Sequence, residues 1–221
     1  MRPKGLVIAI DGPSGAGKST AGRAVAQQLG YVFLDTGAMY RALALAALRA
    51  RVPLDEEAAV AGLAARLRLE LRPGGAVWVD GEDVTSVLRT QEVGAAASRI
   101  SVHPSVRRLL VARQREMGQE GGVVMDGRDI GTAVFPDADV KFYVDAHPRQ
   151  RATRRHEELA QRGHSADLDT IEREIRARDH ADSTRAESPL TRAPDAIHLD
   201  TTELGLDEVV KRMLSAVEAL R

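Results

Sequence analysis

The chain has 221 residues, 43% of them hydrophobic, and a formal net charge of −1, which suits one compact domain with a sizeable core. It has no cysteine, so disulfides and thiolate metal sites are excluded. The near-zero charge with 3% aromatic residues argues against nucleic-acid binding, and no apolar run approaches the roughly 18 residues of a membrane helix.

Short apolar runs rich in β-branched residues alternate with segments of helical spacing. The apolar runs predict strands at residues 6–10, 31–34, 123–125, 140–144 and 196–199. The intervening patterns predict helices at residues 18–29, 38–50, 105–117, 149–162 and 206–220. Such alternation is typical of a parallel sheet covered on both faces. The sequence therefore predicts an α/β fold with a five-stranded parallel sheet flanked by helices.

One segment breaks this alternation. Residues 67–90 hold two runs of period 2 joined by Pro73, Gly74 and Gly75, a pattern that predicts a β-hairpin. It lies between predicted helices, so we expect a small antiparallel insert. Trp78 within it is most simply a packing residue.

The first strand runs directly into a glycine-rich loop, "IAIDGPSGAGKST" at residues 8–20. Gly12, Gly17, Lys18 and Ser19 fit the pattern G-x-x-x-x-G-K-[ST] between a strand and a helix. Glycines let backbone N–H groups wrap a phosphate, the lysine reaches the β- and γ-phosphates, and the hydroxyl can ligate Mg²⁺. Because chance would produce this pattern only on the order of 10⁻³ of the time, we interpret it as a nucleoside-triphosphate site.

This glycine-rich loop, a P-loop, is by itself compatible with several classes of protein: kinases, GTPases, transporter ATPases and motors. The chain contains no asparagine, so it cannot carry the Asn-Lys-x-Asp element with which GTPases read guanine, and it lacks an LSGGQ-like transporter signature. A small phosphotransferase with a second, phosphorylated substrate remains.

Further blocks point to one such family: "LDTGAMYRALALAAL", "LRTQEVGAAASRIS", "DGRDIGTAVFPDADVKFYVDA" and "REIRARDHADSTRAESPL". Together with the P-loop, in this order from about residue 5 to residue 217, they resemble bacterial cytidylate kinases. The resemblance implies a P-loop nucleoside monophosphate kinase fold with a monophosphate-binding insert and a short lid. We expect a core at residues 1–35 and 102–221, the insert at 36–101 and the lid at about 151–167.

The resemblance also implies site residues. Those expected at ATP and Mg²⁺ are Gly12, Pro13, Ser14, Gly15, Ala16, Gly17, Lys18, Ser19, Thr20 and Asp126. Ser19 would ligate the metal, and Asp126 would hold it through water or merely brace the following turn. Those expected at CMP are Thr36, Arg41, Ser98, Arg107, Arg128, Asp129, Arg178, Asp182 and Arg185.

Within the CMP set, each group has an implied partner. Asp129, Ser98 and Arg107 would read the base, Arg178 and Asp182 the ribose, and Thr36, Arg41, Arg128 and Arg185 the phosphate. A carboxylate accepts from the cytosine amine and repels the carbonyl of uracil. Lys18, Arg128, Arg185 and the lid arginines Arg154 and Arg155 would act in catalysis, with Arg162 as a further lid candidate.

The implied activity is in-line transfer of the ATP γ-phosphoryl group to CMP or dCMP, giving ADP and CDP or dCDP, with ATP and Mg²⁺ as cofactors. A kinase for UMP, AMP, dTMP or a small metabolite, and a P-loop regulatory protein, remain alternatives. The start of the chain lacks the apolar run of a signal peptide, so we expect a cytoplasmic protein. The sequence shows no exposed apolar stripe, so we expect a monomer that acts on small molecules.

Overall fold

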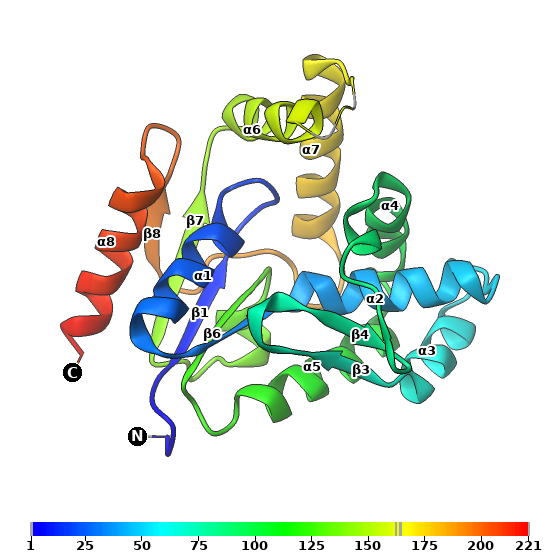
Figure 1. The fold of residues 1–221 in the computed structure, drawn as a ribbon, viewed down its shortest axis with the longest axis horizontal. Coiled ribbons are helices and arrows are strands. Elements are labelled where there is room, and N and C mark those ends of the chain that lie inside the picture. The colour runs from blue at the N-terminus through cyan, green and yellow to red at the C-terminus, as the bar shows by residue number, and fades with distance from the viewer. Residues whose placement is uncertain (1, 162, 164, 221) are drawn as a thin grey trace.

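The computed structural model describes residues 2–161, 163 and 165–220. Its centre is a five-stranded sheet with the strand order β2-β6-β1-β7-β8 (Figure 1). All neighbouring strands pair in parallel, which confirms the predicted sheet. The strands are β1 (Val7–Asp11), β2 (Val32–Asp35), β6 (Val123–Gly127), β7 (Val140–Asp145) and β8 (Ile197–Asp200).

Alternate residues of the central strand β1 enter two different cores. Ile8 and Ile10 are fully buried with residues of α1 (Lys18–Leu29) and α8 (Leu206–Glu218) on one face of the sheet. Val7 and Ala9 are buried on the other face, among residues that include Val111 of α5 (Pro104–Gly118). Because both faces are covered, β1 is a continuous apolar run up to its last residue.

The insert between β2 and α5 has its own apolar core. The predicted hairpin is confirmed: β3 (Leu69–Leu71) and β4 (Val77–Val79) pair antiparallel across a 3₁₀ turn at Pro73–Gly75. A third strand, β5 (Glu82–Asp83), extends the sheet. The insert also contains α2 (Thr36–Arg49), α3 (Glu57–Arg66), a 3₁₀ turn (Val87–Arg89) and α4 (Gln91–Ile100). The sequence interpretation did not predict α3, α4 or β5.

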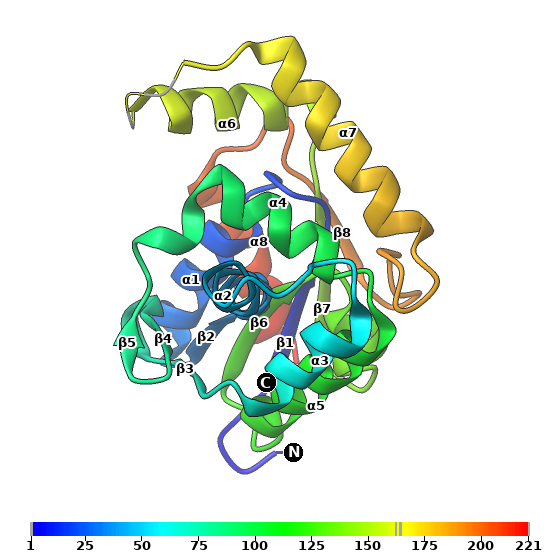
Figure 2. The same ribbon diagram turned by 90° about the vertical axis from the view of Figure 1, so that its right-hand side faces the viewer.

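Two helices follow β7 in the region of the predicted lid. They are α6 (Pro148–Gln161) and α7 (Leu168–Thr184), and they share a small apolar cluster of Ala152, Ile171 and Ile175. Both views show α6 above the loop that joins β1 to α1 (Figures 1 and 2). The limits of core, insert and lid remain predictions.

The carboxyl ends of parallel strands lie at one edge of their sheet, and many of the predicted site residues follow these ends. β1, β2 and β6 end at Asp11, Asp35 and Gly127, so the glycine loop, the start of α2 and the turn "GRD" all leave the same edge. Ligands of open α/β sheets bind at this carboxyl edge. The candidate site therefore lies among the residues that follow these strands.

Candidate active site

The glycine loop between β1 and α1 has a backbone that side chains would not permit. A Cβ on Gly12 would lie 1.9 Å from the carbonyl oxygen of Val144, and φ at this glycine is +142°. Gly15 and Gly17 also adopt positive φ, at 78° and 89°. α1 begins at Lys18 with Gly17 as its N-cap and no side-chain cap. Its first N–H groups are thus available to an anion, as a phosphate site requires.

Lys18 lies buried in the loop that it follows, with only 6% of its surface exposed. Its Nζ donates to the carbonyl oxygen of Pro13 at 2.7 Å. Burial, together with the nearby positive charge of Arg128, lowers the pKa of Lys18 to about 7. A bound anionic phosphate would raise the pKa of Lys18 again and so favour its charged form.

Ser19 and Asp126 join the loop to strand β6. The Ser19 hydroxyl donates to Oδ2 of Asp126 at 2.5 Å, while the buried Oδ1 of the same carboxylate has no hydrogen-bond partner. Burial and the neighbouring carboxylate of Asp35 raise the pKa of Asp126 to about 6. An orphaned carboxylate oxygen beside a serine hydroxyl is an oxygen donor set of the kind that Mg²⁺ takes together with nucleotide phosphates. The residues present therefore fit the metal.

The start of α2 follows from the sequence around Asp35. Its carboxylate accepts the N–H of Ala38 at 2.9 Å, which caps the helix, and also pairs with Arg41 at 2.7 Å. Thr36 is buried, and its hydroxyl donates to the backbone carbonyl of Asp126 at 2.7 Å. Thr36 therefore ties α2 to β6.

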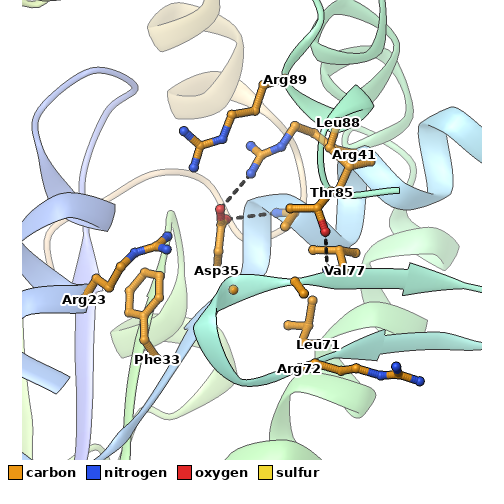
Figure 3. Close-up of a pocket in the computed structure, with 13 residues that line it drawn as sticks. Arg23, Phe33, Asp35, Arg41, Leu71, Arg72, Val77, Thr85, Leu88 and Arg89 are labelled. Atoms are coloured by element: carbon orange, nitrogen blue, oxygen red, sulfur yellow. Dashed lines mark hydrogen bonds and ion pairs between the residues drawn. The ribbon is translucent and has the colours of Figure 1, made fainter. Parts of the chain in front are cut away.

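A pocket opens beside the Asp35–Arg41 pair, between the edge of the main sheet and the insert. Figure 3 shows the Arg41 guanidinium directed at Asp35, with the Arg89 side chain close by. On the far side, the guanidinium of Arg23 lies 5.0 Å from the ring centre of Phe33. The lining residues are Arg23, Phe33, Asp35, Ala38, Arg41, Leu71, Arg72, Gly75, Ala76, Val77, Thr85, Leu88 and Arg89. Four of these lining residues are arginines and one, Asp35, is acidic, so the pocket lining has an excess of positive charge. Of the four arginines, only Arg41 belongs to the predicted phosphate-binding set.

A buried ion pair links α5 to the turn after β6. Arg107 is 2% exposed, and its Nη2 donates to Oδ2 of Asp129 at 2.5 Å. Arg185 approaches the other oxygen of Asp129 at 3.8 Å. Nε of Arg107 and Nη2 of Arg185 are buried without a hydrogen-bond partner. Because buried donors are nearly always paired in folded proteins, these atoms mark a place where a polar ligand would complete the structure.

A second cluster lies between the same turn and α7. Arg128 donates from Nε to Oδ2 of Asp182 at 2.8 Å, and Arg185 lies 3.6 Å from Oδ1 of Asp182. Burial and the charge of Arg128 lower the pKa of Arg178 to about 10. Arg128 and Arg178 both lower the pKa of Lys18, so the P-loop lysine and the expected acceptor-side arginines lie within electrostatic reach of one another.

Arg185 lies just beyond the helix that carries Asp182. α7 ends at Thr184, and Arg185 has an extended backbone. Its Nε donates to the Ser188 carbonyl at 2.7 Å. The loop after α7, rather than helical spacing, brings Arg185 to Asp129 and Asp182.

Several predicted residues lie apart from these clusters or pair elsewhere. The Ser98 hydroxyl donates to the Gly94 carbonyl within its own helix, and Thr20 is exposed. Arg154 donates to the hydroxyl and carbonyl of Thr201, and Arg155 pairs with Glu158. Among the described residues, neither of these two lid arginines forms a hydrogen bond with the glycine loop. Arg162 lies outside the described residues.

Arg151 is a residue that the sequence interpretation missed. It is 3% exposed and its guanidinium donates to the carbonyls of Ala146 and Ser14 and to the carboxylate of Asp179, at 2.8, 3.0 and 2.6 Å. It thus joins the glycine loop to both α6 and α7. No sequence signal distinguishes it from the other arginines in "RQRATRR".

Tyr40 was missed as well. The Arg107 guanidinium lies 5.5 Å from its ring centre, and its buried hydroxyl has no hydrogen-bond partner. Burial raises its pKa to about 12, so the hydroxyl is a neutral donor near the Arg107–Asp129 pair. Its place after "DTGAM" was the only available signal.

Comparison with known proteins identifies the family. The cytidylate kinase family model matches residues 8–219. A cytidylate kinase of Geobacillus sp. (strain WCH70) is 50% identical over 213 residues, which cover 95% of each chain. One from Solibacter usitatus (strain Ellin6076) is 47% identical and covers 99% of this chain and 94% of its own.

The chain belongs to the cytidylate kinase family. Solved structures with low sequence identity share its fold. A gluconokinase from Sinorhizobium meliloti 1021 aligns with a TM-score of 0.51 at 16% identity, covering 100% of this chain and 95% of its own. A shikimate kinase from Acinetobacter baumannii aligns with a TM-score of 0.50 at 14% identity, covering 98% and 95%. The cytidylate kinase family member described here therefore has the architecture of small P-loop kinases.

The described residues offer neither a membrane span nor a metal site of clustered ligands. None of the helices described is long and apolar enough to cross a membrane. Among the same residues, no group of three or more His, Cys, Asp or Glu side chains could hold a metal ion. Ser19 and Asp126 are thus the metal-binding candidates that the geometry offers.

Proposed function

We propose that this protein transfers the γ-phosphoryl group of ATP to CMP or dCMP, giving ADP and CDP or dCDP. The observation that carries the proposal is a set of buried donor atoms without hydrogen-bond partners on Arg41, Arg107 and Arg185. They occur in a chain that also has a P-loop and belongs to the cytidylate kinase family. A phosphorylated acceptor with a polar base would satisfy them.

The chemistry requires little beyond placement and charge. A monophosphate ester loses its second proton with a pKa of about 6, so the acceptor oxygen is already anionic near neutral pH and needs no general base. Lys18 and Arg128, whose charges act on each other, would draw the two phosphate groups together. Positioning and charge neutralisation supply most of the catalysis in phosphoryl transfer.

Ser19 and Asp126 would hold Mg²⁺ against the nucleotide. When bound, the ion would neutralise phosphate charge and orient the triphosphate. The unpaired Oδ1 of Asp126 supports this assignment. The Ser19 hydroxyl, which donates to Oδ2 of that carboxylate, would turn its oxygen toward the ion.

Asp129 is the proposed reader of the base. Its carboxylate is held in place by Arg107, and a carboxylate accepts from the cytosine amine but meets a carbonyl in uracil. Ser98 would assist, although its hydroxyl is turned to Gly94 in this structure. Asp182 and Arg178 would contact the ribose, and Thr36, Arg41, Arg128 and Arg185 the phosphate.

We also propose that Arg154 and Arg155 approach the phosphates when the lid closes, because both pair with residues outside the glycine loop in this structure. Closure would exclude water from the transferring group. The protein is proposed to act in the cytoplasm. It is also proposed to be a monomer, since its exposed large apolar side chains are scattered over separate elements. Analytical ultracentrifugation would measure its mass in solution.

The test is ADP production from Mg-ATP with CMP, dCMP, UMP, AMP, GMP and dTMP as acceptors. Turnover confined mainly to CMP and dCMP is expected. Lys18→Ala should abolish it, whereas Lys211→Ala, a change at an exposed lysine on α8, should not. A preference for another monophosphate would keep a kinase and overturn the base-reading assignment. ATP hydrolysis that no acceptor accelerates would favour a P-loop regulatory protein.

A further inference from the structure

Asp11 closes the central strand β1 with a buried carboxylate that neither the P-loop pattern nor the proposed mechanism uses. It is 4% exposed. Oδ1 accepts the backbone N–H of Ile130 at 2.8 Å, and Oδ2 accepts that of Gly131 at 2.7 Å. One carboxylate thus holds two successive amides of a segment that lies far away in the sequence.

Those amides open a single π-helical turn, Ile130–Val134. Within the turn, the carbonyl of Asp129 accepts from Ala133 and Val134 at 2.8 and 3.1 Å. The first N–H groups of any helical turn have no partner inside it, and here they are buried. Single π-helical turns are rare and are frequently found at functional sites. Asp11 is therefore an N-cap that is supplied by another strand.

The capped turn begins directly after Arg128 and Asp129. On their other side, Gly127 is paired with Asp11 in the register of β1 and β6. Asp11 consequently fixes the backbone on both sides of these two residues, through the sheet before them and through its carboxylate after them. Their side chains in turn hold Arg107 and Asp182.

We propose that Asp11 is a positioning residue for acceptor recognition: by capping the Ile130–Val134 turn it aims Asp129 at the base and Arg128 at the acceptor phosphate. This inference rests on the proposed function. It makes the strand that leads into the ATP loop a determinant of the selection of the other substrate.

The choice of a carboxylate supports this role. Burial raises the pKa of Asp11 to about 7 even though both amide bonds lower it, so the ionised group costs stability. An asparagine would avoid that cost, but it offers one acceptor and would turn an NH₂ donor toward the second amide. Only the carboxylate accepts from both amides.

A different role, as a brace for the lysine of the loop, has less support. Lys18 donates to the Pro13 carbonyl, and among the described residues no hydrogen bond or ion pair joins it to Asp11. The direct contacts of the Asp11 carboxylate are with the turn. An effect on CMP rather than on ATP therefore separates the two roles.

The experiment measures the steady-state kinase kinetics of the wild type, Asp11→Asn and Asp139→Asn with ATP, CMP and UMP. Asp139 is a matched control because its carboxylate, like that of Asp11, accepts a backbone N–H, but the donor is Val7 at 2.8 Å, at the end of β1 opposite to Asp11. We expect Asp11→Asn to raise the KM for CMP about tenfold and to lower the ratio of kcat/KM for CMP over UMP by about tenfold, while the KM for ATP stays within about twofold. Asp139→Asn should change none of the three.

The inference is overturned if Asp11→Asn leaves the CMP KM and the CMP-to-UMP ratio unchanged, or if the ATP KM rises as much as the CMP KM. Should Asp11→Asn not fold, Asp11→Ser, which keeps one acceptor, is compared in the same way. Should neither fold, amide hydrogen exchange decides: exchange at Ile130 and Gly131 must slow with CMP and not with ATP alone. If the wild type itself does not use CMP, the proposed function fails instead.

Discussion

Replacing Asp126 with asparagine should stabilise the substrate-free protein while it greatly reduces phosphoryl transfer. Asp126 is buried, and burial together with the nearby Asp35 raises its pKa from 3.8 to about 6. Asparagine has the same shape and still accepts from the Ser19 hydroxyl. It lacks the charge that the folded chain must keep out of water.

The size of the effect follows from the pKa shift. Between pH 3.8 and about 6 the folded state binds the proton more tightly than the unfolded state, so the free energy of unfolding falls as the pH rises through this window. About two pKa units correspond to about 3 kcal/mol above pH 6, and to less than about 1 kcal/mol at pH 4. Lys18 loses a nearby carboxylate in the variant, which offsets part of the gain. We therefore expect a net stabilisation of about 1–3 kcal/mol at pH 8.

Urea denaturation of the wild type and of Asp126→Asn at pH 4, 6 and 8 measures this difference directly. The advantage of the variant should grow with pH and level off above pH 6. Asp139→Asn, which removes a carboxylate that accepts from Val7 and pairs with Arg2, should show no gain at any pH. A variant at Asp126 that is less stable than the wild type at pH 8, or whose advantage does not depend on pH, would refute the reasoning.

Two further predictions concern the loop and its supports. Arg151→Ala should lower the free energy of unfolding by about 3–5 kcal/mol, because it leaves the Asp179 carboxylate and the Ser14 carbonyl without their donor. The control Arg149→Ala removes an exposed ion pair between α6 and Asp169 of α7 and should cost under about 1 kcal/mol. Equal losses of the two variants in thermal denaturation would contradict the role assigned to Arg151. ATP binding at pH 8 should be accompanied by uptake of a proton, since the pKa of Lys18 is about 7 without ATP and a bound phosphate favours the charged lysine. Calorimetry in two buffers of different ionisation enthalpy should find uptake of nearly one proton at pH 8 and of less at pH 6. Release of protons at pH 8 would contradict this prediction.

The glycine loop and the strand and helix that flank it could be predicted because their signals are local. The residues that shape the loop are contiguous, and the periodicity that predicts β1 and α1 lies on either side of it. Asp35 as the cap of α2 is likewise a matter of three residues, from its carboxylate to the N–H of Ala38. Such features need no knowledge of what packs against them.

The acceptor side could be predicted only through the family resemblance. Arg107, Asp129 and Arg185 come from α5, the turn after β6 and the loop after α7, and no spacing rule connects them. The cap by Asp11 and the contact of Arg151 with Ser14 span 119 and 137 residues. Which arginine of a polar helix turns inward depends on the surface that it meets, and a sequence alone does not contain that surface.

The most direct test of the account is the ratio of kcat/KM for CMP over UMP in the wild type and in Asp129→Asn. We predict that the wild type prefers CMP strongly and that the variant, which replaces a pure acceptor by an amide that can also donate to the uracil carbonyl, reduces the ratio about tenfold to a hundredfold. An unchanged ratio in an active variant would contradict the central claim, because the base would then be read elsewhere.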